Sequence, residues 1–120
     1  MSDEDGIRRT IAQYCHFFDA KRWDELAKVF AEDASVTSRR GTFRGRANVI
    51  RDLQNAMTDD YHGTLFTANS LITVEGNAAS AVSDFMEVED TNILATGTYH
   101  DTFTKSGDTW LMASKEIRLS

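Results

Sequence analysis

The second half of the chain, residues 64–119, consists of four strand-like runs separated only by short polar turns. Runs joined by such short turns pair as antiparallel strands, because a parallel connection needs a crossover of a dozen or more residues. The turns are Gly76-Asn77, Asp90-Thr91-Asn92 and Ser106-Gly107-Asp108. The first half reads mostly as amphipathic helix. Helices followed by a strand meander predict an α+β fold in which the helices cover one face of a single sheet.

The N-terminal half contains three predicted helices and one short strand. A second helix begins near Trp23 and a third follows Gly45, while residues 34–37 are a strand candidate that ends in the turn at 39–41. The chain has no internal repeat, no linker and no proline, so we expect residues 1–120 to form one compact domain. In the first helix, one apolar stripe recurs at spacings of three and four residues: Ile7, Ile11, Tyr14, Cys15 and Phe18.

Composition limits the class of protein, its cellular compartment and its partners. The content of 41% hydrophobic and 27% charged residues is typical of a soluble globular protein. A net charge of −6 argues against nucleic acid as a partner. No apolar run approaches the length of a membrane span, and the acidic N-terminus is unlike a secretory signal. The single cysteine, Cys15, excludes an internal disulfide and suggests a cytoplasmic protein.

Four arginines lie close together before the third helix, and they have two interpretations. They form either a solvated loop or an anion site. The solvated loop is favoured, because the segment has no glycine-rich cradle whose backbone amides would complete an anion site. The four residues are Arg39, Arg40, Arg44 and Arg46.

The run 93–104 alternates between a threonine-rich face and an apolar, aromatic face. Asp101 lies on the apolar face. A buried carboxylate is paired, hydrogen-bonded or protonated, so Asp101 either forms a salt bridge, with Arg118 as the candidate partner, or belongs to a binding cavity. Gly97 on the same face indicates a bend or a close backbone approach. We therefore expect a strongly bent sheet with a pocket at its open end.

For the strands that precede this run, the sequence does not decide which residues face inwards. Asp84 and Glu87 have opposite parity along one strand, so one of them faces the helices unless a bulge intervenes. The sequence therefore predicts a second inward carboxylate without deciding between the two.

Two polar residues of the first helix are candidate site residues. Tyr14 lies in the middle of the buried stripe, so its hydroxyl needs a partner in the interior. Asp19, at the edge of the stripe, either faces the mouth of the pocket or bonds backbone amides ahead of Trp23, and the pattern alone favours the second. His62, in the turn before the sheet, is either exposed or at the rim of the cavity. We find no metal-binding, nucleotide-binding or triad motif, and expect no cofactor and no metal.

The segment from Ile11 to Ala34, IAQYCHFFDAKRWDELAKVFAEDA, resembles the opening of SnoaL-like proteins of the nuclear transport factor 2-like superfamily. This resemblance implies a cone-shaped fold: a curved antiparallel sheet wrapped around helices, with a cavity at the open end. It also implies a homodimer formed through the sheet. Four further segments fit the same pattern: Phe43–Gly45, Asn69–Gly76, Gly97–Asp101 and Gly107–Trp110.

The resemblance also implies roles for individual residues. Asp19 matches the first-helix aspartate that works with a strand histidine in scytalone dehydratase and hexachlorocyclohexane dehydrochlorinase, but Leu65 stands at the histidine position. Tyr14 and Asp101 resemble the pair that holds the oxyanion in ketosteroid isomerases. The isomerase base falls near Ser38 in this chain.

Both partial sets describe proton transfer in an apolar pocket, without a metal or an organic cofactor. We therefore expect a lyase or isomerase of the dehydratase, isomerase or cyclase type that acts on a small, apolar, polyketide- or steroid-like molecule. Asp19 would be the base, with Tyr14 and Asp101 stabilising the oxyanion. The alternative, favoured by Leu65, is a non-catalytic ligand-binding or dimerisation module. The other candidate residues are His62 for catalysis and Asn69, Tyr99, Trp23 and Phe18 for substrate binding.

Overall fold

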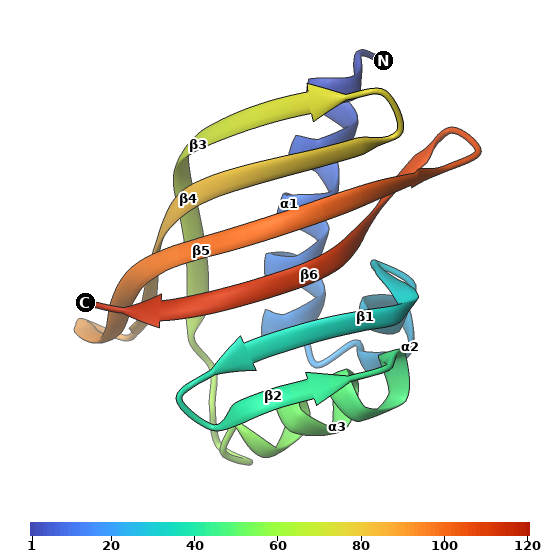
Figure 1. Cartoon of the computed structure of the whole chain (residues 1–120). Coiled ribbons are helices and arrows are strands. Elements are labelled where there is room, and N and C mark those ends of the chain that lie inside the picture. Colours follow the sequence, from blue (N-terminus) through green and yellow to red (C-terminus); the bar gives the residue numbers. More distant parts are fainter.

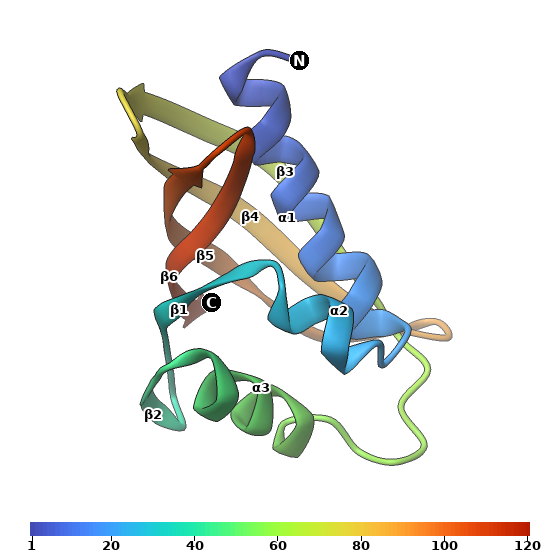
Figure 2. The same ribbon diagram turned by 90° about the vertical axis from the view of Figure 1, so that its right-hand side faces the viewer.

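A computed structural model describes residues 1–120 as one curved sheet of six strands with the helices lying against its inner face (Figures 1 and 2). The helices are α1 (Asp3–Asp19), α2 (Trp23–Ala27) and α3 (Arg46–Asn55). The strands are β1 (Phe30–Ser38), β2 (Gly41–Arg44), β3 (Thr64–Glu75), β4 (Ala78–Glu89), β5 (Asn92–Ser106) and β6 (Thr109–Leu119). The α+β fold and the cone expected from the sequence are confirmed. No helix is long and apolar enough to cross a membrane.

The strand order is β2-β1-β6-β5-β4-β3, and β3 to β6 form the predicted antiparallel meander. The predicted short strand is longer than expected, because β1 already begins at Phe30. β1 pairs in parallel with β6, and it forms a tight hairpin with β2 through the turn at Arg39 and Arg40. As a result β1 and β6 finish side by side, which brings the β1–β2 turn next to the C-terminal end of β6 (Figure 1).

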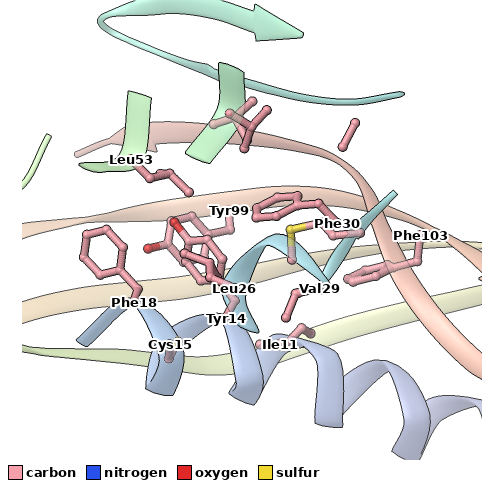
Figure 3. Close-up of a cluster of buried hydrophobic side chains, with 14 of the residues drawn as sticks. Ile11, Tyr14, Cys15, Phe18, Leu26, Val29, Phe30, Leu53, Tyr99 and Phe103 are labelled. Atoms are coloured by element: carbon pink, nitrogen blue, oxygen red, sulfur yellow. The ribbon is translucent and has the colours of Figure 1, made fainter. Parts of the chain in front are cut away.

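The helix α1 crosses the inner face of the sheet and supplies most of the first layer of the core. Ser2 caps its N-terminus by accepting a hydrogen bond from the backbone N–H of Asp5 at 3.1 Å. Figure 3 shows Tyr14 and Phe18 rising from α1 towards Tyr99 of the sheet. The whole predicted stripe is buried: Ile7, Ile11, Tyr14, Cys15 and Phe18.

Two bulges change which residues of the sheet face inwards. In β6, Met112 pairs with Phe103 and Ser114 pairs with Thr102, so Ala113 is an extra residue and the alternation shifts by one. In β3, the register shifts between Ala68 and Leu71 around Asn69, which has a positive φ of 56°. Asparagine is one of the few side chains that adopts this left-handed conformation readily. Each bulge therefore moves a new set of side chains to the inner face.

Gly97 of β5 lies where the backbone of β6 leaves no room for a side chain. A Cβ atom at this position would lie 2.0 Å from the carbonyl oxygen of Arg118 and 2.8 Å from the ring of Phe85. The close approach predicted from the mid-strand glycine is therefore confirmed.

We expect Gly97→Ala to lower the free energy of unfolding by at least about 2 kcal/mol, because a backbone oxygen has no free rotation with which to avoid the added carbon. Urea denaturation of the variant and of Thr96→Ala, an exposed neighbour on the same strand, measures this. Thr96→Ala is expected to change stability by no more than about 0.5 kcal/mol. Equal stability of the Gly97 variant and the parent protein would contradict the close approach.

Candidate functional site

A cavity of about 200 Å³ lies at the end of the sheet where β4 and β6 finish, between α1, α3 and the inner face of the strands. Twelve residues line it and ten of them are hydrophobic. The two exceptions are Arg40 and Glu87, which bring one cation and one carboxylate to an otherwise apolar wall. An apolar pocket with few polar groups is the usual form of a small-molecule site.

Two tyrosines form the polar part of the inner wall. Tyr14 of α1 and Tyr99 of β5 meet edge to face with ring centroids 6.0 Å apart, and Tyr99 stacks on Phe85 at 4.2 Å. Both tyrosines line the cavity, and no hydrogen bond joins either hydroxyl to another protein group. Burial raises the pKa of each hydroxyl well above its ordinary value. Both therefore stay protonated and can donate a hydrogen bond to a ligand.

Behind the tyrosines lies a buried ion pair between Lys115 of β6 and Asp101 of β5. The ammonium is 3.0 Å from Asp101 Oδ1, and both side chains are sealed from solvent. Apart from this ion pair, neither oxygen of the Asp101 carboxylate has a hydrogen-bond partner. The Lys115 ammonium also lies 3.4 Å from the ring centroid of Tyr99 and 4.5 Å from that of Tyr14. These rings supply the cation–π contacts that a desolvated ammonium needs.

This arrangement corrects the predicted partner of Asp101. Arg118 is exposed and pairs with Glu116 on the same strand, so the partner is Lys115 instead. Burial raises the pKa of Asp101 and lowers the pKa of Lys115, while the attraction between the two charges opposes both shifts. Asp101 does not line the cavity. It reaches the cavity only through Lys115 and the two tyrosine rings.

Two carboxylates lie at the rim next to β3 and β4. Glu87 lines the cavity and accepts a hydrogen bond from the Tyr61 hydroxyl at 3.2 Å. Asp19, at the end of α1, accepts from the backbone N–H of Leu65 with both oxygens, at 3.2 and 3.1 Å. Leu65 is the cross-strand partner of Glu87, so the two carboxylates are near neighbours. Asp19 therefore bonds an amide of β3, and the prediction that it bonds amides ahead of Trp23 is wrong.

Burial is the main reason why these two carboxylates hold their protons more tightly than usual. It raises the pKa of Glu87, to which the neighbouring Glu89 adds. It also raises the pKa of Asp19, where the N–H of Leu65 opposes the shift and the charge of Glu87 adds to it. A carboxylate with a raised pKa is a stronger base once it is deprotonated.

On the opposite side of the cavity, Arg40 forms a two-pronged ion pair with Asp52 of α3. Its Nε and Nη2 donate to the two carboxylate oxygens at 2.9 and 3.1 Å, and Asp52 is only 4% exposed. Arg40 lies in the turn and keeps 41% of its side chain exposed, so the interpretation of the arginines as one solvated loop describes it only in part. That interpretation is wrong for Arg46, which donates to the backbone carbonyl of Phe30, whereas Arg39 and Arg44 are exposed.

Besides Asp19 and Asp101, three more candidate residues are absent from the lining of the cavity. His62 is exposed, with Nε2 3.1 Å from Asp90 Oδ1. Asn69 occupies the β3 bulge, where its amide donates to Asp84 at 2.8 Å. Trp23 packs edge-on against Phe18, which does line the cavity. No group of three or more His, Cys, Asp or Glu side chains is arranged to hold a metal ion.

Sequence reasoning missed Arg40 and Tyr61 as residues of this region and left Glu87 undecided. The burial pattern of β4 decides that question, because Phe85 is buried, Glu87 lies two residues further on the same face, and Asp84 is exposed. The only available signal was the opposite parity of Asp84 and Glu87. Arg40 was marked only as one of four clustered arginines, and no local pattern marks Tyr61.

The curved sheet, the covering helices and the small apolar cavity define a class of cone-shaped α+β proteins. The family model of the SnoaL-like domain matches residues 1–116, and the chain therefore belongs to the SnoaL-like family. No curated protein matches the sequence significantly.

Solved structures show the same fold. A protein of unknown function from Mycobacterium tuberculosis aligns with a TM-score of 0.88 and 25% identity, over 96% of this chain and 70% of that one. A candidate scytalone dehydratase from Novosphingobium aromaticivorans aligns at 0.86 and 22%, over 98% and 84%. A hexachlorocyclohexane dehydrochlorinase from Novosphingobium barchaimii aligns at 0.84 and 15%, over 98% and 86%. Two of the similar proteins are of unknown function, and the likeness establishes the fold alone.

We expect Lys115→Met to lower the free energy of unfolding by about 3–5 kcal/mol, because it leaves the Asp101 carboxylate buried without a partner. The double variant Lys115→Met/Asp101→Leu removes both charges and is expected to recover most of that loss. Urea denaturation of the parent, the two single variants and the double variant measures the coupling. Additive losses in the double variant would contradict the ion pair.

Proposed function

We propose that the protein is a cofactor-independent lyase or isomerase that binds a small, largely apolar carbonyl compound in the cavity and moves a proton on it. The observation that carries this proposal is the Glu87 carboxylate, which lines an apolar wall together with two unpaired tyrosine hydroxyls. A desolvated base and preorganised hydrogen-bond donors are the two requirements for removing a proton next to a carbonyl group.

In the proposed reaction, a rim carboxylate takes a proton from the carbon next to the carbonyl group. The electron pair of the broken C–H bond moves to the carbonyl oxygen, where Tyr14 and Tyr99 donate hydrogen bonds to the developing negative charge. Return of the proton to another carbon completes an isomerisation. Departure of a leaving group completes an elimination. Burial keeps both hydroxyls protonated for this role.

Glu87 is the base that the cavity favours, because it lines the wall, and Asp19 is the base that the family resemblance implies. Asp19 does not line the cavity, and both of its carboxylate oxygens accept from the backbone N–H of Leu65. We therefore assign proton removal to Glu87 and a supporting electrostatic role to Asp19. Asp101 acts only indirectly, by holding Lys115 against the rings of the two tyrosines.

Structural neighbours support this choice of chemistry. They include a candidate scytalone dehydratase and a hexachlorocyclohexane dehydrochlorinase, whose names describe eliminations. Their identity with this chain is too low to carry the reaction over. The support from these neighbours is that the same fold hosts such reactions.

The second candidate function is non-catalytic binding of the same kind of ligand. A specific observation favours it: Leu65 lines the cavity at the position where the family's dehydratases have a histidine. The nearest histidine, His62, is exposed and bonded to Asp90. In this alternative the cavity and the tyrosines hold the ligand and no proton moves.

A homodimer through the sheet is part of the same proposal. Large apolar side chains are exposed on the strands, and a partner copy would cover them. These residues on β3, β4 and β5 are Phe66, Leu71, Val82, Ile93 and Leu94.

We expect the protein to exchange the acidic α-protons of β-tetralone for deuterium in D₂O, and Glu87→Gln to slow this exchange by about 10²–10⁴-fold. Proton NMR of the ketone measures the rate. Asp19→Asn is expected to slow it less, and Glu75→Gln, an exposed acid outside the cavity wall, to leave it unchanged. Exchange that survives Glu87→Gln would contradict the assigned base. Binding of the ketone without any exchange would establish the second candidate function.

The rate of this exchange should fall at low pH. The base works only when deprotonated, and burial raises the pKa of Glu87 above its ordinary 4.5. We therefore expect kcat/KM to fall as the pH is lowered through a midpoint above 4.5, measured with the same NMR assay. A midpoint at or below the ordinary value would mean that the base is solvated.

A further inference from the structure

A second hollow continues the cavity outwards over the β1–β2 turn. It has a volume of about 410 Å³, and three of its residues, Arg40, Ile117 and Leu119, also line the inner cavity. The other two are Ser38 and Arg39. Because β1 and β6 run in parallel and finish together, their ends form one continuous wall from the tyrosines to the arginine turn.

The sizes of the two spaces limit how a ligand can fit. The inner cavity, at about 200 Å³, is smaller than the roughly 300–1,000 Å³ of typical ligand pockets. A ring therefore fills it, and the rest of the molecule has to extend through the opening. The opening on this side passes Arg40 and enters the outer hollow.

The outer hollow is cationic. Arg39 is exposed and forms no ion pair, so its charge is free. Arg40 is held in place by Asp52, to which its Nε and Nη2 atoms donate. The Nη1 donors of Arg40 stay unused. Ser38 adds a hydroxyl where the resemblance to ketosteroid isomerases would place a carboxylate. No acidic residue lines this hollow, so nothing in its wall repels an anion.

We infer that the ligand is a small ring-bearing carboxylate, whose ring fills the inner cavity and whose anionic end lies between Arg39 and Arg40. This inference rests on the proposed cavity and adds the class of ligand. The fixed guanidinium of Arg40 presents its donors in a plane, which suits the two oxygens of a carboxylate. Arg39 supplies the net charge, because Asp52 compensates that of Arg40.

The test compares two probes of nearly equal shape, hydrocinnamate and its neutral amide, by isothermal titration calorimetry at low ionic strength. We expect the parent protein to bind hydrocinnamate about tenfold more tightly than the amide, and added salt to reduce this preference. Arg39→Gln is expected to remove most of the preference without changing the affinity for the amide. Arg44→Gln makes the same change of charge at an exposed arginine outside both spaces. This variant is expected to keep the preference for hydrocinnamate over the amide.

The outcomes separate this inference from the proposed function. Equal affinity for the two probes, or equal effects of Arg39→Gln and Arg44→Gln, would overturn the anionic site and leave the cavity proposal intact. Binding of neither probe would overturn both. A preference for hydrocinnamate that depends on Arg39, in a protein that fails to exchange the protons of β-tetralone, would support the anionic site in a non-catalytic binder.

Discussion

The buried ion pair between Lys115 and Asp101 is the interaction on which the cavity depends. The two residues are direct cross-strand partners on the inner face of β6 and β5. Removing two charges from water costs several kcal/mol for each ion, and this cost is offset only by close pairing and by other polarisable neighbours. The rings of Tyr14 and Tyr99 are those neighbours, so the ammonium fixes where both rings lie. Their hydroxyls can then open into the cavity without a protein partner.

Much of this arrangement could be predicted from alternation along the strands and helices. The inward positions of Tyr14, Tyr99 and Asp101 follow from their places on an apolar stripe or face, and Gly97 marked the close approach of two strands. The partner of Asp101 could not be predicted. On an unbroken strand, even-numbered residues such as Met112 and Arg118 would share one face. The bulge at Ala113 reverses this alternation and turns Lys115 inwards.

The rest of the site depends on contacts between residues far apart in the sequence. Asp19, at the end of α1, accepts a hydrogen bond from Leu65 of the edge strand β3. Arg40, in the β1–β2 turn, is held by Asp52 of the helix α3. Neither contact leaves a periodic signal, because each joins the end of one element to another element. The bulge at Asn69 has the same effect on β3, where one extra residue places the asparagine on the outer surface.

The apolar wall also bears on the proposed chemistry. No histidine lines the cavity, so no imidazole can carry a proton between the rim and a leaving group. Burial against this apolar wall raises the pKa of Glu87. A single desolvated carboxylate suits a reaction in which the same group removes a proton and returns it. An elimination that releases water needs a separate acid for the departing hydroxyl, and the best-placed donors, Tyr14 and Tyr99, are held strongly protonated by burial. Within the proposed lyase and isomerase chemistry, the cavity therefore favours proton relocation over loss of water.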